Sequence, residues 1–148
     1  MPDFGTTIDI DAPAEVVWDV IVDVEHWPQW TATMTSVRRE TGSRPLTVGE
    51  RVRVRQPRLP PVVWTVTDVQ PGRSFAWTAT GPGVRSVGDH AVVPRPDGGG
   101  STATVRFTST GPLAGLSWLL LGRLTRRYVQ TEAAGLKERS ETRARDTD

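Results

Sequence analysis

The sequence predicts an α+β domain in which one long C-terminal helix covers a curved antiparallel sheet of seven strands. Short β-rich runs separated by glycine and proline fill residues 33–110, and an uninterrupted helical pattern follows from 111 to 141. A strand and an amphipathic helix precede both, within residues 4–24. A single helix laid in a curved sheet seldom fills it, so this architecture predicts a cavity between the two layers.

The chain opens with FGTTIDID at residues 4–11, where apolar and polar residues alternate as in a half-buried strand. The next segment, residues 11–24, carries a proline in its first turn, and Val17, Val20, Ile21 and Val24 share one face. This spacing predicts an amphipathic helix. Pro28 permits at most one more short turn, so we expect one or two short helices here.

Six further strands are predicted between these helices and the last one. Glycine and proline signals such as GPG at 81–83 and PRPDGGG at 94–100 separate them, and the short turns favour an antiparallel meander. The expected strands cover residues 33–41, 50–56, 62–69, 74–80, 84–93 and 101–110.

The last helix is expected over residues 112–140. Leu113, Leu116, Leu120, Leu124 and Tyr128 form one continuous stripe along it. We expect this stripe to face the sheet, with the leucines at 116, 120 and 124 buried. Residues 1–140 then form a single ligand-binding domain, and the polar residues 141–148 form a disordered tail.

Composition limits the function. The chain has 148 residues, 18 basic and 17 acidic, two histidines and no cysteine, which disfavours a nucleic-acid surface, disulfides and a protein-bound metal. No phosphate loop or nucleophile elbow occurs, and we expect no cofactor. The N-terminus lacks a signal-peptide pattern and the longest apolar run, LSWLLLG, is too short to span a membrane. The expectation is a cytoplasmic protein without an integral membrane segment, and a homodimer stays open.

Two segments carry a family resemblance. An Ala-Pro-x-Glu-x-x-Trp helix start, from Ala12 to Trp18, precedes Asp23, Pro28 and Trp30, and GDHAVVPRPDGGGSTATV joins a His-containing strand to a glycine-rich turn and a Thr-x-Val strand. Together with the order of elements, they resemble the START-related SRPBCC superfamily, in its polyketide cyclase/dehydrase branch with the helix-grip fold. The resemblance implies a deep apolar pocket beneath the C-terminal helix, used for lipids, polyketides, hormones or aromatic metabolites. It implies no shared catalytic motif.

Strand parity selects the candidate ligand-binding residues of the sheet. Inward positions of the predicted strands carry large apolar side chains, which either pack as ordinary core or line the cavity. These residues are Trp64, Val66, Phe75, Trp77, Val92, Val105 and Phe107, to which the helix stripe adds Leu116, Leu120, Leu124 and Tyr128.

Two tryptophans lie in the segment DVEHWPQW, at residues 23–30. Each either closes the end of the core or contacts ligand. We expect Trp30 to close the core and Trp27 to stand at the cavity entrance. His26, in the same segment, is expected to be exposed.

His90 is the candidate catalytic residue. His90 and Val92 are two residues apart and so share one face of the predicted strand, which we expect to point inward. There His90 is either a structural hydrogen-bonding residue or a proton-transfer group. Tyr128 is either core or a polar anchor. Arg53 and Arg55 are solvated if Val52 and Val54 face inward, and anchor a ligand anion in the reverse orientation.

Three functions remain open. The favoured one is binding of a hydrophobic, ring-containing small molecule, lipid or polyketide-like, in the cavity. The first alternative is a polyketide cyclase, aromatase or dehydratase in which His90 moves protons. The second is a protein-interaction module without ligand. The arginines at 123, 126 and 127, beside LSWLLLG, suggest either docking on an anionic membrane or a solvated helix end, and the latter is favoured because the sheet can cover that run.

Overall fold

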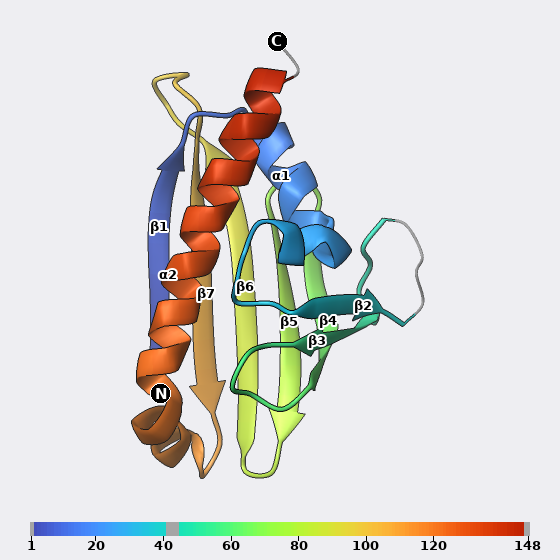
Figure 1. Cartoon of the computed structure of the whole chain (residues 1–148), viewed down its shortest axis with the longest axis vertical. Coiled ribbons are helices and arrows are strands. Elements are labelled where there is room, and N and C mark those ends of the chain that lie inside the picture. Colours follow the sequence, from blue (N-terminus) through green and yellow to red (C-terminus); the bar gives the residue numbers. More distant parts are fainter. Residues whose placement is uncertain (1, 41–44, 147–148) are drawn as a thin grey trace.

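Seven antiparallel strands form one curved sheet in the order β1-β7-β6-β5-β4-β3-β2 (Figure 1). The computed structural model describes residues 2–40 and 45–146. All seven expected strands are present, although β2 is shorter than predicted, and residue 41 of its expected range lies outside the described residues. The strands are β1 Asp3–Ile10, β2 Ser36–Arg39, β3 Arg51–Arg55, β4 Val62–Gln70, β5 Ser74–Gly81, β6 Val84–Pro94 and β7 Ser101–Thr110.

Two short helices follow β1. The α-helix α1, Ala14–Val22, buries Val17, Val20 and Ile21, as its spacing predicts. The 3₁₀-helix η1, Val24–Gln29, contains Pro28. Both cap one end of the sheet's concave side (Figure 1). The α+β helix-grip prediction is therefore confirmed in its strands, its short helices and its long last helix.

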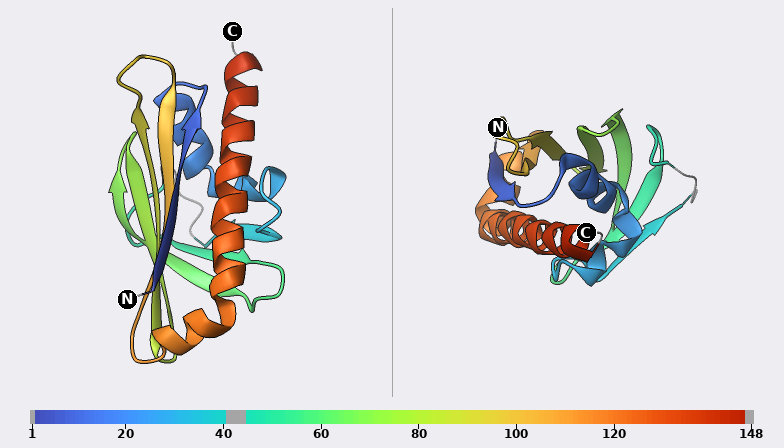
Figure 2. Two further views of the ribbon diagram at one scale, coloured as in Figure 1. Left: turned by 90° about the vertical axis from the view of Figure 1, so that its left-hand side faces the viewer. Right: turned by 90° about the horizontal axis from the view of Figure 1, so that it is seen from above.

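The long helix α2, Ala114–Asp146, lies across the concave face of the sheet (Figure 2). Its first turns lie at an angle to the rest of the helix in the same view. Small residues of this helix are buried in different ways: Gly122 lies under the ring of Trp118 from its own helix, whereas Ala133 packs against Val105 of the sheet. Within the described residues, no helix combines the length and apolarity that crossing a membrane requires.

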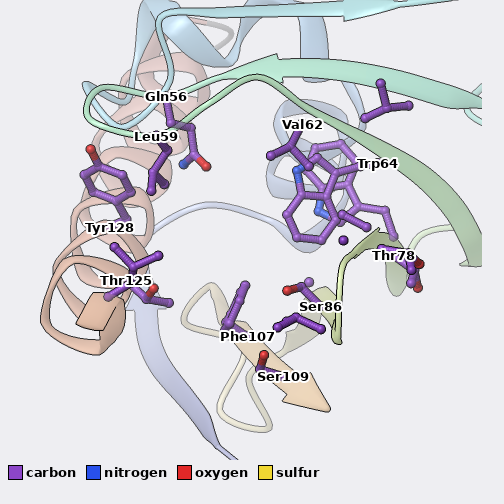
Figure 3. Close-up of a pocket in the computed structure, with 18 of the residues that line it drawn as sticks. Gln56, Leu59, Val62, Trp64, Thr78, Ser86, Phe107, Ser109, Thr125 and Tyr128 are labelled. Atoms are coloured by element: carbon purple, nitrogen blue, oxygen red, sulfur yellow. The ribbon is translucent and has the colours of Figure 1, made fainter. Parts of the chain in front are cut away.

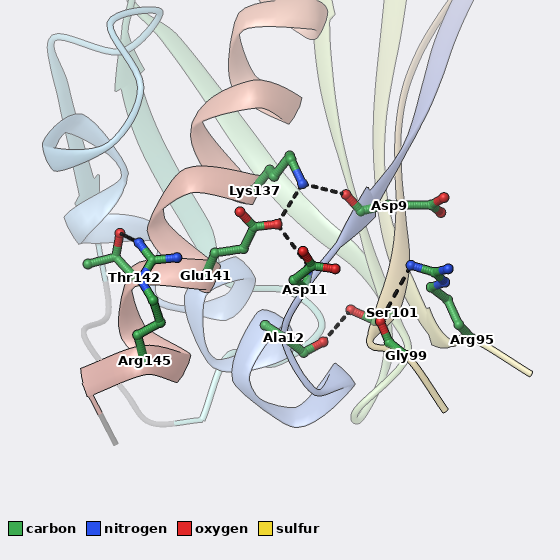
Figure 4. A network of polar contacts seen from close by, with 10 residues as sticks. All are labelled: Asp9, Asp11, Ala12, Arg95, Gly99, Ser101, Lys137, Glu141, Thr142 and Arg145. Atoms are coloured by element: carbon green, nitrogen blue, oxygen red, sulfur yellow. Dashed lines mark hydrogen bonds and ion pairs between the residues drawn. The ribbon is translucent and has the colours of Figure 1, made fainter. Parts of the chain in front are cut away.

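The expected disordered tail is wrong for residues 141–146, which continue α2, while residues 147–148 lie outside the described residues. Glu141 explains the continuation: its carboxylate accepts hydrogen bonds from the Asp11 amide at 2.9 Å and from Lys137 Nζ at 2.5 Å (Figure 4). Lys137 Nζ also donates to the Asp9 carbonyl at 3.0 Å. The last turns of the chain are thus fastened to the end of its first strand. The Asp11 amide, followed by Lys137, lowers the pKa of Glu141.

The concave face of the sheet divides into two parts. Under α1 and η1, inward residues such as Val66, Phe75 and Val92 are almost fully buried and pack with Trp27 in one core cluster. Under the middle of α2, a smaller cluster contains Val105, Val129 and Ala133. The cavity lies beyond these packed regions, toward the end of the sheet where α2 begins.

Candidate functional site

A cavity of about 740 Å³ lies between the sheet and α2 (Figure 3). Strands β4 to β7 supply its floor, residues 117–132 of α2 supply one wall, and the loop at 56–61 supplies another. This volume is within the range of small-molecule pockets, which are typically about 300–1,000 Å³. The architecture thus produces the unfilled space that a single helix across a curved sheet predicts.

Aromatic rings form the apolar floor of the cavity. Trp64 and Trp77 stack with their ring centroids 5.6 Å apart and their planes 26° apart. Trp77 pairs with Gly88 across β5 and β6, and a Cβ at residue 88 would lie 2.7 Å from the Trp77 Nε1. The glycine therefore creates the space in which the indole lies flat against the neighbouring strand. Phe107, on β7, also lines the cavity.

One buried polar pair lies in the cavity wall. His90 Nε2 is 3.0 Å from Oε1 of Glu132, which comes from α2, and the two residues are 5% and 8% exposed. The imidazole stacks on Phe75 at 4.6 Å between centroids, with Trp27 at its edge. The Nδ1 atom has no hydrogen-bond partner among the described residues. The ring is thus held through Nε2, while Nδ1 is buried and unpaired among the described residues.

Tyr128 joins the helix wall to the loop wall. Its hydroxyl donates a hydrogen bond to the Pro57 carbonyl, so that α2 holds the loop at 56–61 over the cavity. Figure 3 shows Gln56 and Leu59 from this loop beside Tyr128, with Thr125 below them on α2. In this structure the Tyr128 side chain therefore lines the cavity, and its hydroxyl is occupied by the hydrogen bond that holds the loop.

Several polar side chains also face the cavity. They are hydroxyl groups from both layers, which can hydrogen-bond a ligand without adding charge. The residues are Thr78, Ser86, Ser109, Ser117 and Thr125. The described part of the chain holds no cluster of three or more His, Asp or Glu side chains that could bind a metal ion.

The structure brings together six of the predicted ligand-binding residues around the cavity and places the others elsewhere. Those that line it are Trp64, Trp77, His90, Val105, Phe107 and Tyr128. The inward parity of Val66, Phe75 and Val92 is also correct, but each is about 1% exposed and packs in the core beneath α1 and η1. Whether any of the lining residues contacts a ligand stays a prediction.

Trp27 and not Trp30 closes the core, and neither tryptophan lines the cavity. Trp27 is fully buried at the centre of the aromatic core, and its Nε1 donates to the Ile21 carbonyl at 3.0 Å. Trp30 is only partly buried; it packs against that core and lies beside Gly135 of α2, away from the cavity. Trp27 lies within η1, whereas Trp30 follows its last residue with a backbone that has left the 3₁₀ conformation, so the two side chains need not point the same way. His26 is exposed, as expected, and bonds to Asp23.

The predicted stripe of leucines on α2 is wrong in orientation. Leu116 and Leu120 are 54% and 73% exposed, and Leu124 is half-buried outside the cavity. The run LSWLLLG is apolar on every side, so its periodicity does not define which face turns inward. Ala114 and Gly122 are buried in this part of the helix, Gly122 under the ring of Trp118.

The open question about strand β3 is answered by its burial pattern. Val52 and Val54 are buried, while Arg53 and Arg55 are exposed and solvated. Neither Arg53 nor Arg55 can therefore anchor a ligand in the cavity.

Sequence reasoning missed Glu132, Trp118 and the loop at 56–61. A signal for Glu132 was present, because Val129, Ala133 and Leu136 share a helical face that includes position 132. All three of these neighbours are buried. The loop had no comparable signal, since its position depends on the Tyr128 hydrogen bond between distant segments.

A curved seven-stranded antiparallel sheet, one long helix across it and a cavity between them define a helix-grip domain of the SRPBCC type. The chain belongs to the family described as polyketide cyclase/dehydrase and lipid transport, whose model matches residues 1–141. The curated proteins include no significant match to this sequence.

Solved structures share the fold at low sequence identity. The Zhui aromatase/cyclase from Streptomyces sp. R1128 is 19% identical, with a TM-score of 0.75 over 96% of this chain and 94% of that one. A protein from Thermus thermophilus is 20% identical, with a TM-score of 0.74 over 97% of this chain and 99% of that one. The di-domain aromatase/cyclase StfQ of the steffimycin biosynthetic pathway is 14% identical, with a TM-score of 0.72 over 96% of this chain and 51% of that one. At these identities the likeness establishes the fold alone.

Proposed function

We propose that the protein binds an apolar, ring-containing small molecule in the cavity between the sheet and α2. The observation that carries this proposal is the stacked pair Trp64 and Trp77 on the floor of a cavity of about 740 Å³. Flat aromatic walls favour flat ligands, because ring stacking adds to the area that leaves water. Hydroxyl groups around the rim can orient such a ligand.

Binding can be read from the protein's own fluorescence. Trp64, Trp77 and Trp118 line the cavity, so a naphthalene-based probe that enters it should quench tryptophan emission in a saturable manner. Native mass spectrometry of the protein purified from its own host would show whether a small molecule accompanies it.

A matched pair of variants locates the binding site. Thr125 faces the cavity from α2, and Thr125→Trp places an indole in that space. We expect it to weaken probe binding about tenfold or more, since the ligand and the new ring compete for one volume. Thr131→Trp adds the same ring to an exposed position of the same helix and should bind the probe like the wild type. Equal affinity in all three proteins would place the ligand outside the cavity.

A second candidate function, proton transfer on a bound polyketide-like substrate, is favoured by the His90–Glu132 pair. With the Glu132 carboxylate accepting from Nε2, the base would be Nδ1 of a neutral His90, which is buried in this structure, so the surrounding side chains would have to move before it takes a proton from a carbon next to a carbonyl and leaves an enolate. The enolate carbon would then attack a second carbonyl of the substrate, and the first proton would be returned to the resulting alkoxide. Loss of water would require a second proton to be taken from the same carbon and delivered to the departing hydroxyl group. The cavity would contribute by folding the chain of the substrate.

Two substitutions distinguish this chemistry from plain binding. His90→Gln keeps hydrogen bonding but cannot titrate, so turnover of a polyketide-like substrate should fall about 10²–10⁴-fold while probe binding persists. Glu132→Gln should lower kcat with little change in KM if the carboxylate positions His90. We expect the wild type to bind apolar ligands without transforming a panel of such substrates. Turnover that His90→Gln abolishes would instead establish the enzyme.

A further inference from the structure

An unusual group of apolar side chains is exposed where α2 begins. Of the seven large apolar residues exposed among those described, five lie between residues 113 and 121. Leu119 and Leu120 are 81% and 73% exposed, well beyond the partial exposure of an ordinary amphipathic helix. We call this group the leucine patch, and it consists of Leu113, Leu116, Leu119, Leu120 and Leu121.

The patch lies at the end of the molecule where the cavity opens. The Leu113 amide donates to the Gly83 carbonyl at 2.9 Å, which joins the patch to the turn between β5 and β6. Leu121, 40% exposed, also lines the cavity, together with residues of that turn and of the loop at 56–61. Three segments, 56–61, 80–86 and 109–131, therefore surround the opening. In Figure 2 the first turns of α2 project at this end of the molecule.

These three segments have a strongly positive charge. They contain five arginines and neither aspartate nor glutamate, whereas the whole chain has a net charge of only +1. All five arginines are exposed: Arg58, Arg85, Arg123, Arg126 and Arg127. Arg126 also lies over the Trp118 ring at 5.6 Å. The cavity end of the molecule thus combines exposed leucines with unbalanced positive charge.

A second copy of the chain fits this surface poorly. A twofold interface centred on the patch would bring the same arginines of both copies together without an acidic residue from these segments. A lipid surface fits both features, because leucines enter the boundary between headgroups and acyl chains while arginines attract anionic headgroups.

We propose that the leucine patch and its neighbouring arginines dock the protein on a membrane surface that carries anionic lipids. The docked orientation places the cavity opening against the bilayer, so that an apolar molecule passes between bilayer and cavity with little exposure to water. The docking itself does not depend on which molecule the cavity holds.

Co-sedimentation with vesicles tests the proposal on the full chain. We expect the protein to sediment with vesicles of equimolar phosphatidylcholine and phosphatidylglycerol, to do so less at high salt, and to stay in solution with pure phosphatidylcholine. No sedimentation with anionic vesicles, or equal sedimentation with both compositions, would overturn the proposal.

Variants separate the two contributions. Arg123→Gln with Arg127→Gln should weaken binding to anionic vesicles roughly thirtyfold, at about 1 kcal/mol per arginine. Leu116→Ser, Leu119→Ser and Leu120→Ser together should weaken it about tenfold or more. Both variants should keep the wild-type melting temperature, since the altered side chains are exposed.

Matched controls remove the same groups elsewhere. Arg53→Gln with Arg55→Gln takes two arginines from the exposed face of β3, and Val93→Ser takes an exposed apolar side chain from β6. Both should bind vesicles like the wild type. If the arginine variant on β3 loses as much vesicle binding as the arginine variant on α2, anionic lipids attract basic residues over the whole protein surface. The leucine patch is then not the docking surface. If the wild type is a dimer that the leucine variant dissociates, the patch joins two copies and the proposal is wrong.

Discussion

The His90 side chain shows how single residues define this site. It comes from the middle of β6 and meets Glu132 from α2, which is 42 positions later in the chain. Phe75 stacks on its ring and Trp27 meets its edge, so the imidazole is held by three different elements. Such support fixes the orientation of the ring, which both specific binding and proton transfer require.

Gly88 is a second residue on which the site depends. A methyl group there would lie 2.7 Å from Trp77 Nε1, so Gly88→Ala should displace the indole and cost about 1–3 kcal/mol of stability. Denaturant unfolding measures the loss, and near-ultraviolet circular dichroism reports the displaced ring. Gly81→Ala is the control, because nothing lies within 4 Å of its added methyl group. Equal stability of the two variants would show that Trp77 adapts without cost.

At the scale of elements, α2 performs two tasks along its length. From its middle onward it buries Val129, Ala133 and Leu136 and completes the core. Its first half leaves the cavity open on one side and the leucine patch exposed on the other. The bend visible in Figure 2 accompanies this division of the helix.

Two leucines on this helix should respond differently to truncation. Leu136 is 2% exposed, so Leu136→Ala should cost about 2–5 kcal/mol through lost burial and the space left behind. Leu120 is 73% exposed, and Leu120→Ala should change stability by no more than about 0.5 kcal/mol. Urea unfolding of both variants measures the difference. A large loss in the Leu120 variant would mean that the patch is covered in solution.

At the scale of the whole molecule, the last helix is fastened to the first strand. Lys137 and Glu141 bond to the backbone at Asp9 and Asp11, which holds α2 over the concave face (Figure 4). Strands β1 and β2 are the two edges of the sheet and do not pair with each other. The hydrogen bonds between α2 and the β1 edge therefore limit how far the helix can move away from the cavity.

The fastening should make stability depend on pH. Hydrogen bonds from the Asp11 amide and Lys137 lower the pKa of Glu141 below its ordinary value of 4.5. Because the folded protein holds the ionised form, this contribution is complete above that value and is lost as the pH falls through the lowered pKa. Glu141→Gln should cost about 1 kcal/mol near neutral pH, and the difference from wild type should shrink in acid.

Urea unfolding at a series of pH values measures this dependence. Glu138→Gln removes one charge from an exposed position of the same helix and serves as the control. A difference between Glu141→Gln and wild type that stays constant from neutral to acidic pH would contradict the assigned role.

The sequence by itself determined the strands, the order of elements and the side of the sheet on which Trp64, Trp77 and His90 lie. Alternation in a strand has a period of two, so the inward face follows directly from the residue pattern. The absence of cysteine and the net charge of +1 likewise follow from the sequence alone.

Only the tertiary structure decided which inward residues line a cavity and which are core. Phe75 and Trp77 share one strand face, yet only Trp77 lines the cavity, because it extends to Trp64 on the cavity floor while Phe75 is stacked on His90 within the packed core. The rotation of α2 was equally undetermined, since a run that is apolar on every side has no preferred face until it meets the sheet. The leucines at 116 and 120 then turned outward. The His90–Glu132 pair exists only through that rotation, which brings a helix carboxylate to a strand imidazole.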